Sequence, residues 1–200
     1  MVRAGRARAG AVAGAALLVA VAAACSPAAA PGTPLPTAVV VPQADCLAPA
    51  VLDRLGLTLD PSLAARATHA PDLTAGRVPA GFVATSVVQC QVGGQMRDSA
   101  GTWTAVTVTS REGSAADVAA LVAALDGTAR RTGAADVATS CGPDAAPVVL
   151  WLLDTMDRAV LSDVAVDGCG GVGDQVRAAL ERIPVTGAVD QPVALVAAAR

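Results

Sequence analysis

Lysine, asparagine and tyrosine are absent from the 200 residues, and phenylalanine, isoleucine and histidine each occur once. Without lysine the chain has no Schiff-base amine, no Walker-type phosphate lysine and no serine–lysine dyad. Alanine, valine, glycine, proline and arginine are abundant instead, which is what a very GC-rich genome encodes. The missing residue types therefore exclude several enzyme classes before any motif is considered.

The sequence also has few features of a metal-binding or nucleic-acid-binding protein. It has one histidine and no CxxC pair, whereas a metal site needs clustered ligands. The formal net charge is −3, and it becomes −6 without the first 24 residues, which hold three arginines and no acid. An acidic chain does not attract phosphate backbones. We therefore expect no cofactor, no metal and no nucleic-acid partner.

The first 24 residues have the composition of a bacterial signal peptide. Arg3, Arg6 and Arg8 precede the apolar run "AGAVAGAALLVAVAAA", and no acidic residue interrupts it. This run is too short and too rich in alanine to span a bilayer stably. We interpret residues 1–24 as a signal peptide and expect the protein to be exported.

Cys25 follows the small residues "AAA", as the lipid-modified cysteine of a bacterial lipoprotein does. The site departs from the usual pattern because Ala22 stands where leucine is commonest. An ordinary signal peptidase cleaving after Ala22 or Ala24 is the alternative, and the protein would then be secreted. We expect a lipid on Cys25, a membrane anchor through it, and a location on the outer face of the cytoplasmic membrane.

Cysteine parity supports this interpretation. The chain has five cysteines, and in an oxidising compartment one of them must remain unpaired. A lipid on Cys25 leaves four for two disulfides. Sequential pairing, Cys46 with Cys90 and Cys141 with Cys169, is the simplest of the three connectivities.

The chain divides by composition into four parts. Residues 25–44 contain five prolines and no charge, so we expect a lipid-anchored tether that could reach about 60 Å if extended. Residues 45–185 are long enough for one disulfide-stabilised domain with a single core. The last segment, 186–200, is expected to be a C-terminal tail.

Hydrophobic periodicity predicts an α+β fold for the domain. Two strands are expected within 82–92 and 102–110, followed by a helix at 115–127 that Ser114 caps. The order recurs later, with strands at 147–154 and 159–166 and a helix at 171–183. We expect these two strand–strand–helix units to form a mainly antiparallel four-stranded sheet with helices on one face. A short helix in 45–57, with Asp45 as its N-cap and Gly56 at its end, precedes them.

Four segments carry a resemblance to known sequences: "VPAGFVATSVVQCQV", "GTWTAVTVTSREGSAADVAALVAAL", "CGPDAAPVVLWLLD" and "CGGVGDQVRAALERI". Over about residues 70–183 the chain resembles uncharacterised predicted lipoproteins of high-GC Gram-positive, actinobacterial bacteria. The resemblance implies a place in the cell envelope. It brings no assigned activity and no catalytic residues.

Three residue patterns are candidate functional sites. His69 would serve a Ser-His-Asp triad with Asp72 nearby, but no GxSxG elbow accompanies it. Gly168, Gly170 and Gly173 spell GxGxxG, yet too little chain follows for a nucleotide-binding sheet. Trp103 is placed opposite the inward valines of its strand, so its ring is a candidate ligand contact.

The sequence therefore favours a non-enzymatic binding or accessory module of the cell envelope, with an unknown ligand and an unknown protein or cell-wall partner. The alternative is an extracytoplasmic hydrolase that uses His69 with a nearby acid and serine. A serine or acid within hydrogen-bond reach of His69, inside a pocket, is the feature that would favour the alternative.

Overall fold

The computed structural model describes residues 35–65, 68–69, 73–129, 147–164 and 172–199. Within these ranges the elements follow one another as β1 (Val40–Val41), α1 (Pro49–Leu55), α2 (Pro61–Ala64), β2 (Ser86–Arg97), β3 (Gly101–Glu112), α3 (Ala115–Ala129), β4 (Val148–Leu153), β5 (Ala159–Leu161), α4 (Asp174–Glu181) and β6 (Val185–Ala198). Both predicted strand–strand–helix units are present, as β2–β3–α3 and β4–β5–α4.

The sheet has six strands in the order β1-β5-β4-β2-β3-β6, and every neighbouring pair is antiparallel. The expected four-stranded sheet is therefore wrong, although the α+β class is right. The two additional strands lie at the edges and come from segments that were expected outside the domain. The short β1 belongs to the proline-rich segment, whose extended backbone already suits a strand. The long β6 belongs to the expected tail, and its side chains are mostly exposed, so it lacks the alternation that marks a half-buried strand.

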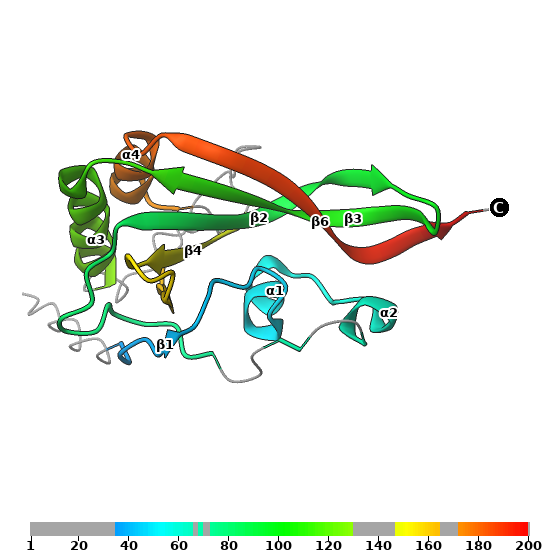
Figure 1. Ribbon diagram of the computed structural model, residues 1–200, viewed down its shortest axis with the longest axis horizontal. Helices are drawn as coiled ribbons and strands as arrows, with labels where there is room; N and C mark the ends of the chain where they lie inside the picture. Colours follow the sequence, from blue (N-terminus) through cyan, green and yellow to red (C-terminus); the bar gives the residue numbers. More distant parts are fainter. Residues whose placement is uncertain (1–34, 66–67, 70–72, 130–146, 165–171, 200) are drawn as a thin grey trace, which may run out of the picture.

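Strand alternation separates two apolar layers on the two faces of the sheet. Val87 of β2 packs with α3 and α4 on one face, whereas Cys90 packs with α1 on the other. Figure 1 shows α3 and α4 together at one end of the long strands, with α1 on the other side of the sheet. The core against α3 and α4 includes Val118, Leu121, Leu150, Leu152, Val176, Leu180 and Ile183. Helices thus cover both faces, the short α1 alone on one of them.

The helix boundaries follow local capping chemistry. Ser114 accepts a hydrogen bond from the N–H of Asp117 at the start of α3, as predicted. Gly56 ends α1 in the left-handed conformation, with φ of 68°, which costs glycine little because it has no Cβ. Ala48, not Asp45, is the N-cap of α1, because Pro49 occupies the first helical turn and its missing N–H fits there.

The folded part begins before Asp45. Ala38 is buried in the core, and its N–H donates to the carbonyl oxygen of Arg77 at 2.9 Å. Residues 1–34, which include the expected signal peptide and the start of the tether, lie outside the described residues. None of the helices in the described ranges is both long and apolar enough to cross a membrane.

Candidate functional site

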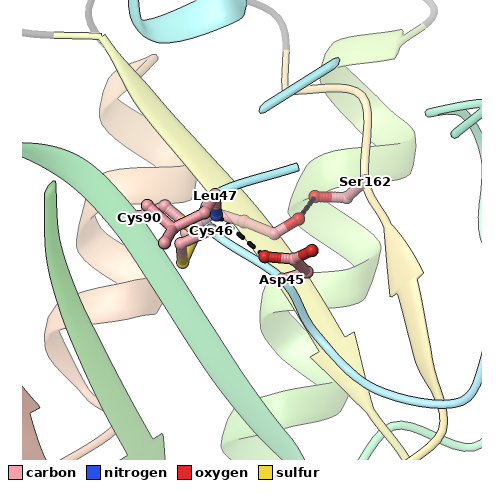
Figure 2. Close-up of a disulfide and its surroundings, with 6 residues drawn as sticks. Asp45, Cys46, Leu47, Cys90 and Ser162 are labelled. Atoms are coloured by element: carbon pink, nitrogen blue, oxygen red, sulfur yellow. Dashed lines mark hydrogen bonds between the residues drawn. A yellow bond between two sulfur atoms is a disulfide. The ribbon is translucent and has the colours of Figure 1, made fainter. Parts of the chain in front are cut away.

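A disulfide joins Cys46, just before α1, to Cys90 in β2. The two Cα atoms are 5.6 Å apart, and both residues are buried. Figure 2 shows the bridge, with Asp45 and Leu47 next to it. This pairing is the one predicted from parity and from the inward face of Cys90. It fixes the start of α1 against a central strand of the sheet. Cys25, Cys141 and Cys169 lie outside the described residues, so the lipid site and the second disulfide stay predictions.

Asp45 and His69 form a close pair beside this disulfide. The Nδ1 atom of His69 lies 2.7 Å from Oδ2 of Asp45, and the side chains are 14% and 22% exposed. The other carboxylate oxygen of Asp45 accepts the N–H of Leu47 at 2.9 Å (Figure 2). Asp45 therefore closes the turn that precedes α1 and also holds the imidazole. The sequence had suggested Asp72 as the neighbouring acid, and Asp72 lies outside the described residues.

A cavity of about 420 Å³ opens next to this pair on the α1 side of the sheet. It is lined by Gln43, Ala44, Asp45, Cys46, Leu47, Thr68, His69, Val88, Val108, Leu153, Asp157 and Gln191. A smaller cavity of about 180 Å³ shares Gln43, Asp45 and Thr68 with it and is further lined by Val41, Pro42, Leu73 and Trp151. We call these two spaces together the Asp45 pocket. Its described lining has two acids, one hydroxyl and no arginine.

Trp151 forms part of the wall of the Asp45 pocket, and its side chain is fully buried. Its indole N–H has no hydrogen-bond partner among the described residues. A buried donor without a partner costs about 1–3 kcal/mol. The sequence correctly placed Trp151 in the core, but the apolar run around it gave no sign of an adjacent cavity or of an unpaired donor.

Trp103, the candidate ligand contact, is buried with 4% of its surface exposed, so its expected exposure is wrong. Its indole N–H donates to Oδ1 of Asp98 at 2.8 Å. The strand β6 pairs with β3, and Leu195 lies opposite Trp103 in the register. Trp103 thus stabilises the β2–β3 turn.

Asp154, at the turn between β4 and β5, has structural partners. Asp154 accepts the N–H groups of Met156 and Arg158 and a two-pronged bond from the Arg158 guanidinium. Burial acts to raise the pKa of Asp154, but these hydrogen bonds outweigh it and the pKa lies below its ordinary value. Asp157 has a φ of 59° and lines the Asp45 pocket from this turn.

Comparison with known proteins gives no further assignment: no family model, curated protein or solved structure matches the chain. In the described ranges, no group of three or more histidine, cysteine or acidic side chains is arranged to hold a metal ion. Of the three glycines in the GxGxxG pattern, Gly173 is described, and it is the N-cap of α4.

Proposed function

We propose that the protein is a lipid-anchored, extracytoplasmic binding module that captures its ligand in the Asp45 pocket without catalysing a reaction. The basic start, the short apolar run and the small residues before Cys25 support export and lipidation. The Cys46–Cys90 disulfide is in keeping with an oxidising compartment. The resemblance of residues 70–183 to predicted lipoproteins agrees with this location.

The indole N–H of Trp151, which has no hydrogen-bond partner in the described part of the chain, is the observation that carries the binding proposal. A polar group that stays buried without a partner lowers stability, and natural proteins satisfy almost all such groups. Trp151 lines the smaller cavity, and the proposal places a ligand oxygen there as the missing acceptor. With two acids and no arginine in the lining, the pocket suits a neutral or cationic ligand with a carbonyl or hydroxyl group.

The test is capture from the native envelope with the membrane-anchored full chain and two tryptophan variants of β6. Gln191→Trp fills the larger cavity, which Gln191 lines. Ala188→Trp places the same bulk on the same strand at an exposed position outside the pocket lining. We expect a ligand that co-purifies with the wild type and with Ala188→Trp and is lost in Gln191→Trp, as detected by mass spectrometry. Equal recovery from all three proteins would reject the Asp45 pocket as the binding site.

The Asp45–His69 pair favours a second candidate, the extracytoplasmic hydrolase. A carboxylate on Nδ1 orients an imidazole so that Nε2 can act as a base. An acid is thus within reach of His69 inside a pocket, as the hydrolase requires. The described lining holds no serine and no free thiol, and Thr68 supplies its one hydroxyl.

Hydrolysis of a panel of simple esters and amides separates the two candidates. The binding module predicts the same background rate for the wild type and for His69→Ala. A rate above background that His69→Ala and Asp45→Asn both abolish, while Asp53→Asn on the exposed side of α1 retains it, would establish the hydrolase instead.

A further inference from the structure

We propose that a second cavity, on the opposite side of the sheet, binds a small carboxylate-bearing ligand. This cavity has a volume of about 450 Å³ and is lined by Gln89, Gln91, Arg111, Val148, Val172, Arg177, Leu180 and Glu181. Gln89 and Gln91 alternate along β2 with Val88 and Cys90, which face α1. The cavity, which we call the Arg111 pocket, is therefore separate from the Asp45 pocket and independent of the function proposed for it.

A polar cluster, formed by Gln89, Gln91 and Arg111, interrupts the apolar core face at this cavity. Gln89 is 8% exposed and lies in register with Leu150, a fully buried core residue of β4. The side-chain nitrogen of Gln89 donates to Oε1 of Gln91 at 2.7 Å, and Nε of Arg111 donates to Oε1 of Gln89 at 3.2 Å. These bonds hold the glutamine and arginine side chains in fixed positions at the cavity wall.

Arg111 is further fixed by the end of α4. Its Nη1 atom donates to the carbonyl oxygens of Leu180 and Ile183 at 3.3 and 2.9 Å. Its Nη2 atom has no hydrogen-bond partner among the described residues. A guanidinium stays protonated in proteins, so this positive charge is permanent. Arg111 therefore presents an immobilised cation with donors to spare.

Arg177 of α4 brings a second guanidinium to the same cavity. Its Nη2 atom donates to the carbonyl oxygen of Val172 at 2.9 Å, and Nη1 lies 3.7 Å from Oδ1 of Asp174. Its Nε atom has no partner in the part of the chain that the structure describes. Two arginines held by their own hydrogen bonds thus line one space from two elements.

The remaining hydrogen-bonding capacity of this lining is mainly that of donors. The positions without a partner among the described residues are N–H groups on Arg111, Arg177 and the Gln91 amide. The carboxylate of Glu181, exposed on α4, is the opposing charge. A carboxylate fits the planar fork of a guanidinium, and the apolar walls formed by Val148, Val172 and Leu180 suit a short aliphatic group beside it. These features together specify an acid with a small apolar side chain.

The experiment titrates the full chain, in detergent micelles, with N-acetylvaline and with the uncharged N-acetylvaline amide by calorimetry. We expect the acid to bind with a dissociation constant of about 1 mM, and the amide to bind at least about tenfold more weakly. Arg177→Gln should weaken binding of the acid by about three- to tenfold. Asp53→Asn, which changes one charge on the other side of the sheet, should leave it unchanged.

The direction in which Glu181→Gln changes the affinity for the acid distinguishes ligand binding from a structural role. Removing this carboxylate removes repulsion of an anion, so the affinity for the acid should rise by about threefold. A structural role for the cluster would not make the loss of a surface charge improve binding. Equal affinity for acid and amide, weaker binding by Glu181→Gln, or no heat from the acid up to about 20 mM would each overturn the proposal.

Discussion

The N–H of Asp60 donates a hydrogen bond to the carbonyl oxygen of Val193 at 2.7 Å. Asp60 is also the N-cap of α2, and its carboxylate accepts the N–H of Ser62 at 2.9 Å. The outer side of β6, the longest strand and an edge of the sheet, is thus partly covered by the segment that starts α2. Edge strands with free backbone groups recruit other chains, and such a cover reduces that risk.

Asp60→Asn should make the contact between the start of α2 and β6 insensitive to acid. Hydrogen bonds from the hydroxyl and N–H of Ser62 hold the pKa of Asp60 below its ordinary value. The stabilisation is therefore present above the ordinary pKa and lost as pH falls through the lowered folded-state pKa. Thermal unfolding followed from about pH 6 to pH 2 should show a smaller acid-induced loss in Asp60→Asn than in the wild type. Asp53→Asn is the control, and identical pH profiles for wild type and Asp60→Asn would contradict the prediction.

Replacing both Cys46 and Cys90 by alanine should lower the free energy of unfolding by about 4 kcal/mol, because the bridge closes a long loop in the unfolded chain. Urea unfolding of the variant and of the oxidised wild type measures the difference. An unchanged midpoint would mean that the unfolded chain is already compact around this loop.

Non-reducing peptide mapping tests the second predicted disulfide, and a Cys141–Cys169 peptide is the expected product.

The two tryptophans should respond differently to replacement by phenylalanine. Trp103→Phe removes a hydrogen bond to the Asp98 carboxylate and should cost about 2 kcal/mol. Trp151→Phe removes a buried N–H that has no partner among the described residues, so its cost should stay below about 1 kcal/mol. Chemical denaturation of both variants gives the comparison. A larger loss for Trp151→Phe would show that the shape of its ring outweighs the unpaired donor.

The Asp45–His69 contact should contribute a coupling energy of about 1 kcal/mol. A double-mutant cycle with Asp45→Ala, His69→Ala and the combined variant isolates it. Asp45→Ala should cost more than His69→Ala, because it also releases the N–H of Leu47. Additive effects of the two substitutions would show that the pair does not stabilise the pocket.

Cys25→Ala should release the protein from the membrane or block its maturation. Two acyl chains anchor a protein stably, whereas one binds only marginally. Intact-mass measurement of the mature wild-type N-terminus tests the lipid directly. A mature chain that starts at Cys25 or Ala23 without acyl mass would identify a secreted protein.

The sequence predicted local and periodic features well. The two-residue alternation around Cys90 and the even number of cysteines left after Cys25 led to the Cys46–Cys90 bridge, and Ser114 and Gly56 marked helix ends through their own chemistry. It failed for β6, because Val193 is the one residue of this strand with a buried side chain. An edge strand defined by backbone pairing leaves little trace in side-chain alternation.

The candidate site was less predictable than the fold. His69 was recognised, but its partner Asp45 lies 24 residues away and was interpreted as a helix cap. The contact depends on where the chain passes after α2, which no local pattern specifies. The polar cluster of Gln89 and Arg111 was hidden for a related reason, since Arg111 donates to the carbonyl oxygens of Leu180 and Ile183, some 70 residues further along the chain.

The Cys46–Cys90 bridge also determines how the domain would carry a mechanical load. If the protein is held to a membrane through Cys25, a pull on its N-terminal segment first breaks the backbone hydrogen bonds of residues 36–39 to Thr74 and Arg77 and then separates the two-residue β1 from β5. At Cys46 the force passes covalently into β2, which is paired with β3 and β4 on its two sides. Once those hydrogen bonds are broken, residues 47–89 would carry almost no tension, because the disulfide bypasses them. The walls of the Asp45 pocket contributed by this segment, His69 among them, would keep their shape while the tether is stretched.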